Sequence, residues 1–321
     1  MSLVIELSAV VVTIRDHQAF VLCLPYDGLR QDGPQLALPS GPFLPHNHRT
    51  FDLALRAFVT EQTGFTIGYV EQLYTFGDDG RYAPVITEGH AVADQQAERI
   101  ISLGYLALTP DKAFHTGLKT EWVAFSELFP WEDWREGQPV CLKQLKPVLD
   151  QWANTVAGPE QAVRQMRVQT LFPEDFDHWN EERVLDRYEL LYDAGLIPEA
   201  HRHQGKAPDP RTGGHEMMSD HRRIIATGLS RLRGKIKYRP VIFELMPERF
   251  TLLELQRALE AITGLNLHKQ NFRRALDRTG FVTPLGVYND DTGGRPAELY
   301  SYNRDQFRFS PSQGLSLPTL R

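Results

Sequence analysis

The side chains best suited to a chemical task lie in the segment NLHKQNFRRALDRTG, residues 266–280. Leu267, Phe272 and Leu276 fall on one side of a helix, so that side is predicted to face a core. The opposite side then carries cations and amides, which can grip the edges of guanine and adenine through paired hydrogen bonds. The residues predicted to enter a DNA major groove are Lys269, Gln270, Asn271, Arg273 and Arg274.

A preceding helix is predicted to hold this basic helix in place. Thr251 and Glu254 have the spacing of a capping box, in which each side chain bonds the other residue's backbone N–H. The helix that they begin is expected to end at Gly264. The basic helix is expected to start at Asn266, as its N-cap, and to stop at Gly280.

A hairpin is predicted to follow the two helices. Residues 281–287 and 297–303 have strand patterns, and the turn between them contains Arg295. Arg295 is predicted to touch the DNA backbone or the minor groove. Two helices and a basic hairpin form a winged helix-turn-helix. Upstream, a helix from Asp220, as its N-cap, to about Arg233 is expected to lead into this unit.

A second motif lies between Leu38 and Phe65, LPSGPFLPHNHRTFDLALRAFVTEQTGF. It predicts a loop and then a helix from about Thr50 to Thr63, with Gly64 as a left-handed end. This layout resembles the Nudix box. In that family, carboxylates on the helix hold divalent metal ions against a diphosphate, because Mg²⁺ prefers oxygen ligands.

The metal ligands of the Nudix box are largely missing from this sequence. Arg49 falls where the loop glutamate is expected, Ala57 and Phe58 replace an Arg-Glu pair, and Gln62 replaces the second glutamate. Only Glu61 remains, and one carboxylate cannot assemble a metal cluster. The box is therefore predicted to be kept as a scaffold and lost as a catalyst, with no cofactor required.

The surrounding pattern predicts a Nudix-like α/β/α sandwich over residues 1–130. The segment VEQLYTFGDDGR at 70–81 resembles the corresponding strand and loop of Nudix-related transcriptional regulators, whose pocket takes ADP-ribose-like nucleotides. Arg81 would there form a bidentate pair with a diphosphate. The predicted ligand-binding residues are Gly41, Arg49, Glu61 and Arg81. The predicted strands are 3–14, 19–24, 70–76, 99–108 and 121–125.

The carboxyl part closely resembles the winged-helix half of Nudix-related regulators of NAD metabolism. The matching segments are 220–264, HKQNFRRAL at 268–276 and GRPAELY at 294–300. The resemblance implies a homodimeric transcription factor that binds double-stranded DNA and senses a nucleotide such as ADP-ribose. The expected fold class is α/β plus α+β. Residues 140–215 have no counterpart in the resemblance, which leaves the usual ligand and target genes open.

Three parts are predicted along the chain: a ligand-binding domain at 1–130, a helical insertion or connector at 131–215, and a linker helix with the winged helix at 216–310. Helical patterns in the insertion cover about 143–156, 159–169 and 176–194, and 199–214 is expected to be a linker or exposed loop.

Charge separates the carboxyl part from the rest. Residues 1–215 hold 18 Lys and Arg against 30 Asp and Glu, a balance of −12, whereas 216–321 hold 17 against 11, a balance of +6. The stretch RLRGKIKYRP at 231–240 contributes five of these cations. A basic part on an acidic body favours a polyanion as partner.

Composition also bounds the cellular setting. No stretch approaches the roughly 20 apolar residues that span a bilayer, and the amino end reads as a strand and not as a signal peptide. Cys23 and Cys141, the only cysteines among 321 residues, lack metal-type spacing. They are expected to be reduced thiols, and the protein is expected to be cytoplasmic with no membrane partner.

Two alternatives stay open from the sequence. The first is an active Mg²⁺-dependent Nudix hydrolase of a nucleoside diphosphate derivative, in which Glu61 is helped by carboxylates outside the box; Mg²⁺ enters only in this case. The second is a scaffold whose segment 140–215 recruits a protein partner. The candidate helping carboxylates are Asp78, Asp79, Glu88 and Glu98.

Overall fold

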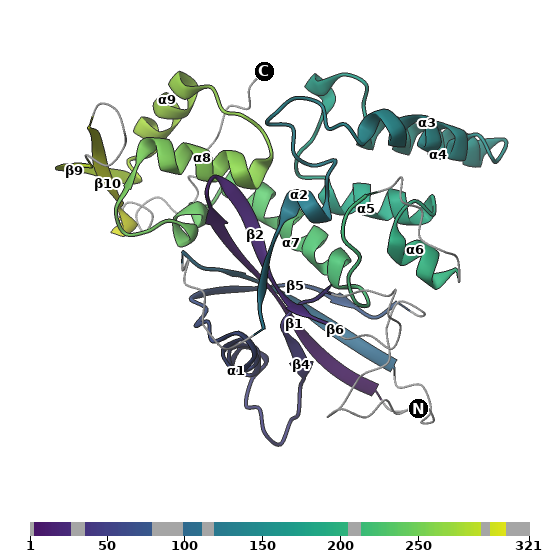
Figure 1. Ribbon diagram of the computed structural model, residues 1–321, viewed down its shortest axis with the longest axis horizontal. Coiled ribbons are helices and arrows are strands. Elements are labelled where there is room, and N and C mark those ends of the chain that lie inside the picture. The colour runs from purple at the N-terminus through teal and green to yellow at the C-terminus, as the bar shows by residue number, and fades with distance from the viewer. Residues whose placement is uncertain are drawn as a thin grey trace.

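A mixed β-sheet organises the amino-terminal part of the chain, with helices on both of its faces (Figure 1). The computed structural model describes residues 3–26, 36–78, 99–110, 119–204, 213–289 and 296–305. Within these, the strand order is β3-β2-β1-β6-β5, with β4 beside β1 and β7 beside β2. β1 and β6 run parallel and the other pairs are antiparallel. The strands are β1 (Leu3–Arg15), β2 (Gln18–Pro25), β3 (Leu36–Ala37), β4 (Ser40–Pro42), β5 (Tyr69–Phe76), β6 (Arg99–Leu108) and β7 (Glu121–Ala124).

The alternation of β1 explains why both faces of the sheet are covered. Leu7 and Val11 pack with the buried side of helix α1 (Phe51–Thr63) in one core. Val10 and Val12 point to the other face and belong to the larger core. Successive side chains of a strand point to opposite faces, so an apolar run such as that of β1 needs a layer on each side. The predicted α/β/α layering is confirmed, but one of its two helical layers comes from beyond the predicted range of 1–130.

The second helical layer is α7 (His221–Ile236), which the sequence predicts as a linker helix. A Cβ on Gly104 of β6 would lie 2.9 Å from Ile224 Cγ2, and one on Gly228 would lie 3.3 Å from Val10 Cγ1. The two glycines therefore let α7 and the sheet approach closely. Asp220 is the N-cap residue of α7, as predicted, but its side chain makes no capping hydrogen bond, and its carboxylate lies 3.5 Å from the Arg223 guanidinium.

The middle segment is helical, as predicted, but its boundaries differ. The expected helix over 176–194 is present only as Val184–Asp193. Before it, Asp175 and Asn180 accept hydrogen bonds from the backbone N–H groups of Asp177 and Glu182 and form local turns. The expected loop after 199 begins with a helix that has Pro198 at its first turn. The elements are α2 (Phe125–Leu128), α3 (Leu142–Ala153), α4 (Pro159–Leu171), the 3₁₀ helix η1 (Phe176–His178), α5 (Val184–Asp193) and α6 (Pro198–His203).

The carboxyl-terminal elements form the predicted winged helix. Helices α8 (Leu252–Thr263) and α9 (Lys269–Thr279) lie beside a small sheet of order β8-β10-β9. At its base the ring of Phe243 stacks on that of Tyr302 with centroids 4.2 Å apart. The remaining elements are the 3₁₀ helix η2 (Val241–Leu245), β8 (Phe250–Thr251), β9 (Val282–Asn289) and β10 (Ala297–Tyr302).

The helix ends of this domain test the cap predictions. The Thr251–Glu254 capping box is present, and Gly264 ends α8 with a φ of 71°. Asn266 is not the cap of α9, which begins after His268. The Asn266 amide instead donates to the carbonyl of Arg135, at 2.7 Å. No helix among the described residues is long and apolar enough to cross a membrane.

Candidate functional site

The space around the Nudix-like box is filled by aromatic rings. Gly41 lies beneath Phe58, so close that a Cβ on Gly41 would be 2.9 Å from the ring. His48 packs edge-on against Phe58, with ring centroids 5.1 Å apart, and Phe43 meets Phe51 at 4.4 Å. Phe58 supplies no oxygen where the family's box has a carboxylate. Gly41, predicted to bind ligand, is buried and pairs with Leu7 on β1.

Gln62, which replaces the second glutamate of the box, locks the loop to the helix. Its Nε2 donates to the Ser40 carbonyl at 2.6 Å, and its Oε1 accepts from the Ser40 N–H at 3.1 Å. A carboxylate can only accept, so glutamate could not make both bonds. The substitution therefore exchanges a metal ligand for a structural contact.

The predicted ligand residues are not gathered at one point. Arg49 and Glu61 are both exposed but sit at opposite ends of α1, about 15 Å apart along its axis. Arg81 lies outside the described residues, as do Asp79, Glu88 and Glu98 of the hydrolase alternative. Asp78 pairs with Arg223 on α7. Within the described ranges, no group of three or more His, Cys, Asp or Glu side chains could hold a metal ion.

Helix α9 presents the predicted polar face. Phe272, Ala275 and Leu276 are buried against the domain core. Asn271 is half-buried at the edge of the exposed face. Arg295 of the hairpin turn falls outside the described part of the chain. The side chains that lie on the exposed face are Lys269, Gln270, Arg273 and Arg274.

The basic stretch at 231–240 serves the interior more than a partner. Arg233 is buried beside Glu132, Lys235 pairs with Glu71 on β5, and Lys237 lies 2.8 Å from Glu181. These three cations are therefore paired with carboxylates of the acidic body, whereas Arg231 and Arg239 are exposed.

A buried ionic cluster joins α7 to the helix-turn-helix. The Glu132 side chain is 2% exposed, and its carboxylate accepts from Arg187 at 2.6 and 2.9 Å and from Arg233 at 2.6 Å. Burial lowers the pKa of Arg233, and Glu132 opposes that shift. Arg233 also donates to the carbonyl of Ile262 near the end of α8, at 2.7 Å. The turn after α8 is held further by the backbone N–H of Trp134, which donates to the Gly264 carbonyl with an N–O distance of 2.8 Å.

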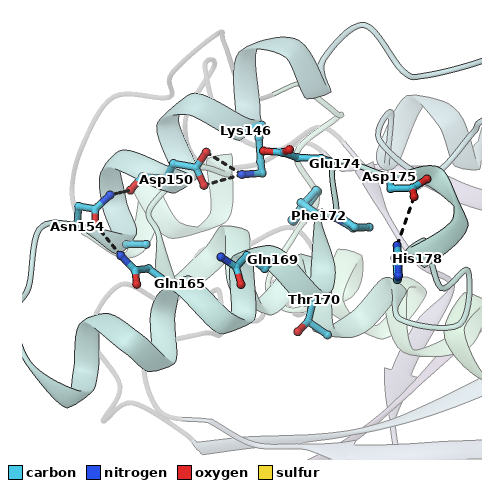
Figure 2. Close-up of a pocket in the computed structure, with 12 residues that line it drawn as sticks. Lys146, Asp150, Asn154, Gln165, Gln169, Thr170, Phe172, Glu174, Asp175 and His178 are labelled. Atoms are coloured by element: carbon cyan, nitrogen blue, oxygen red, sulfur yellow. Dashed lines mark hydrogen bonds and ion pairs between the residues drawn. The ribbon is translucent and has the colours of Figure 1, made fainter.

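A polar groove of about 880 Å³ lies between α3 and α4 (Figure 2). Lys146, the one Lys or Arg among its lining residues in the described structure, lies 2.7 Å from both carboxylate oxygens of Asp150. The Asn154 Oδ1 accepts from Gln165 at 2.9 Å. Glu174 and Asp175 add negative charge, so the groove does not favour a polyanion. Recruitment of a protein by this segment stays a prediction.

Comparison with known proteins identifies the carboxyl-terminal domain. Residues 242–302 match the family model of the NrtR DNA-binding winged helix domain. These residues are therefore similar to the NrtR winged helix domain. Among curated proteins, the ADPR responsive transcriptional repressor NtrR of Acinetobacter baylyi is 34% identical over 103 residues, which are 32% of this chain. The match spans 41% of that relative's length.

Solved structures extend the similarity to the whole fold. The crystal structure of Shewanella oneidensis NrtR complexed with a 27mer DNA matches with a TM-score of 0.55 and 19% identity, over 99% of this chain and 98% of that one. A MutT/nudix family protein from Enterococcus faecalis matches with a TM-score of 0.51 and 14% identity, over 94% and 89% of the two chains. The resemblance to the Nudix-related regulator family is confirmed, as is the predicted fold class.

Proposed function

We propose that this protein is a ligand-responsive, DNA-binding transcriptional regulator. The observation that carries the proposal is the exposed face of α9, where Arg273 and Arg274 lie with Lys269 and Gln270 on an NrtR winged helix. Arginine fits guanine through two hydrogen bonds and glutamine fits adenine in the same way. A helix whose apolar side is buried and whose cations face outward is suited to a major groove.

The amino-terminal domain is proposed to bind an ADP-ribose-like nucleotide without cleaving it. The curated relative is described as responsive to ADPR, and the NrtR structure matches over 99% of this chain. Phe58 and Gln62 occupy positions that would need carboxylates for metal-assisted hydrolysis. Arg49, Glu61 and Arg81 are the proposed ligand contacts, and binding requires no metal cofactor. A homodimer is proposed as the DNA-binding form, and the cytoplasm as its location.

Helix α7 is the proposed link between ligand and DNA. It packs on the sheet through Gly228, and Lys235 bonds both Tyr69 and Glu71 of β5. In the same last turn of α7, Arg233 reaches α8 by donating to the carbonyl of Ile262. A ligand that favours one placement of α7 on the sheet therefore also favours one placement of the helix-turn-helix. The size of the effect equals the difference in ligand affinity between the two placements.

Fluorescence anisotropy on a labelled duplex from upstream of the protein's own gene tests the proposal. Binding should be specific, weaken as salt is raised, and shift when ADP-ribose is added. Arg273→Ala should lower affinity by about 1–3 kcal/mol and relax the sequence preference. Arg183→Ala, which removes an exposed arginine from the middle segment, is the matched control and should change little.

The same samples distinguish the regulator from the hydrolase. With Mg²⁺ present, ADP-ribose should remain intact over the course of the titration. Steady release of AMP that stops in Glu61→Gln, together with no preference for the upstream duplex over random DNA, would overturn the regulator proposal in favour of the hydrolase.

A further inference from the structure

A buried histidine at the start of α7 has one ring nitrogen without a hydrogen-bond partner among the described residues. His221 is 1% exposed, and its Nδ1 accepts the backbone N–H of Leu38 at 2.9 Å. Burial lowers the pKa of His221 to about 4, so the ring is neutral at pH 7 and its proton sits on Nε2. The Nε2 atom has no hydrogen-bond partner among the described residues. Buried donors in folded proteins are nearly always paired, so this one calls for a partner.

The histidine lines a small cavity between α7 and the sheet. The cavity has a volume of about 30 Å³, enough for a water molecule or a small polar group. Ser102 on β6 and Glu6 on β1, which are direct neighbours in the parallel pair, also line it. Ile100 and Ile224 contribute apolar walls. The volume suits a small group such as a hydroxyl better than a whole sugar ring.

The chemistry of the walls selects the kind of group. Three acidic residues, Glu6, Asp78 and Asp220, line the cavity, which disfavours an anion. The His221 Nε2–H can only donate, which disfavours a cation. A hydroxyl satisfies both sides, since its oxygen accepts from the imidazole and its proton goes to a carboxylate.

The cavity adjoins the Nudix-like box. The carboxyl group of Glu6 forms a hydrogen bond with the side chain of Ser40, and the backbone of Ser40 is held by Gln62. Glu6 also lies opposite Pro42 in the β1–β4 pair, one residue from Gly41. A molecule bound beside the box loop therefore has this cavity within reach.

We propose that this cavity is a sugar-hydroxyl subsite, in which His221 donates to a ribose hydroxyl of the effector, the Ser102 hydroxyl bonds the same group, and Glu6 or Asp220 accepts from it. The inference rests on the proposed nucleotide-sensing function and adds the residues that recognise the sugar. Binding places the effector at the start of α7, the helix whose far end holds α8.

Two variants isolate the proposed contact in isothermal titration with ADP-ribose. His221→Asn keeps an acceptor for the Leu38 N–H near the position of Nδ1 and removes the Nε2 donor. Ser102→Ala removes a hydroxyl from the cavity wall. Each should weaken ADP-ribose binding about fivefold to tenfold, the range expected for one lost neutral hydrogen bond.

Ser8→Ala is the matched control. The Ser8 and Ser102 hydroxyls bond each other at 3.0 Å, so both serine variants lose the same internal bond, but only Ser102 lines the cavity. ADP-ribose affinity should be unchanged in Ser8→Ala. ADP, which lacks the second ribose, identifies the sugar: a loss with ADP-ribose alone assigns the distal ribose, and a loss with both assigns the adenosine ribose.

The outcomes separate this inference from the function on which it rests. Unchanged ADP-ribose affinity in His221→Asn, or equal losses in the two serine variants, would mean that the cavity holds only an internal water. Absence of ADP-ribose binding by the unaltered protein would overturn both the effector and the subsite, while DNA binding would still stand or fall on Arg273. If His221→Asn does not fold, the serine pair decides alone.

Discussion

Replacing Glu132 by Gln should be among the most damaging single changes in the protein. The carboxylate is buried and is shared by two buried guanidinium groups, those of Arg187 and Arg233. The change removes the one negative charge between two positive charges and turns an amide NH₂ toward guanidinium donors. Breaking a buried ion pair by removing one partner costs about 3–5 kcal/mol. Since whole proteins are stable by about 5–15 kcal/mol, this is a large fraction of the total.

Urea unfolding followed by tryptophan fluorescence measures the loss, because Trp179 lies under the Arg187 guanidinium at 3.9 Å and reports on the cluster. Glu182→Gln is the control: it also removes a carboxylate paired with a cation, Lys237, but at a half-exposed position. Exposed pairs contribute about 0–1 kcal/mol, so the midpoint of the control should barely move. A loss below about 1 kcal/mol in Glu132→Gln would refute the idea that this cluster holds α7 to the helix-turn-helix.

Two further predictions concern the box and the buried histidine. Gln62→Glu restores a box glutamate yet should destabilise the fold by about 1–3 kcal/mol, because a carboxylate would face the Ser40 carbonyl, and it should confer no Mg²⁺-dependent hydrolysis. Thermal unfolding and an AMP-release assay check both parts. Burial lowers the pKa of His221 from 6.5 to about 4. Its neutral form therefore contributes stability that is present above pH 6.5 and lost as pH falls toward 4, by about 3 kcal/mol. The His221→Asn variant should lack this component when unfolding curves at pH 7 and pH 4 are compared, and an identical pH dependence in both proteins would contradict it.

Local signals made much of the fold predictable. The ends of α1 and α8 follow from caps at Thr50 and Thr251 and from glycines just beyond each helix, which are contacts between near neighbours in sequence. The layer occupied by α7 was not predictable in this way. Its place depends on contacts of Gly104 and Gly228 with side chains more than a hundred residues away in sequence. Such shape complementarity produces no periodic pattern in the sequence.

The candidate site shows the same division. The outward position of Arg273 and Arg274 follows from helical periodicity alone. The role of the cations at 231–240 could not be predicted from periodicity, because Arg233 and Lys235 pair with carboxylates 101 and 164 residues away in sequence. His221 gave no signal at all, because what sets it apart is a bond to a backbone group 183 residues earlier.

The structure joins these distant contacts through one element. Helix α7 has 16 residues and is therefore about 24 Å long, with His221 at one end and Arg233 near the other. Linkage makes the proposed coupling reciprocal: if ADP-ribose weakens DNA binding by some factor, bound DNA must weaken ADP-ribose binding by the same factor. Anisotropy titrations in both directions measure the two factors. Glu132→Gln, studied under conditions where it remains folded, should bring both coupling factors close to a value of 1, which means no coupling. The reason is that the change frees the far end of α7 from α8. Unequal coupling factors in the two directions would show that the measured binding is not at equilibrium. Coupling factors that are unchanged in Glu132→Gln would place the coupling outside α7.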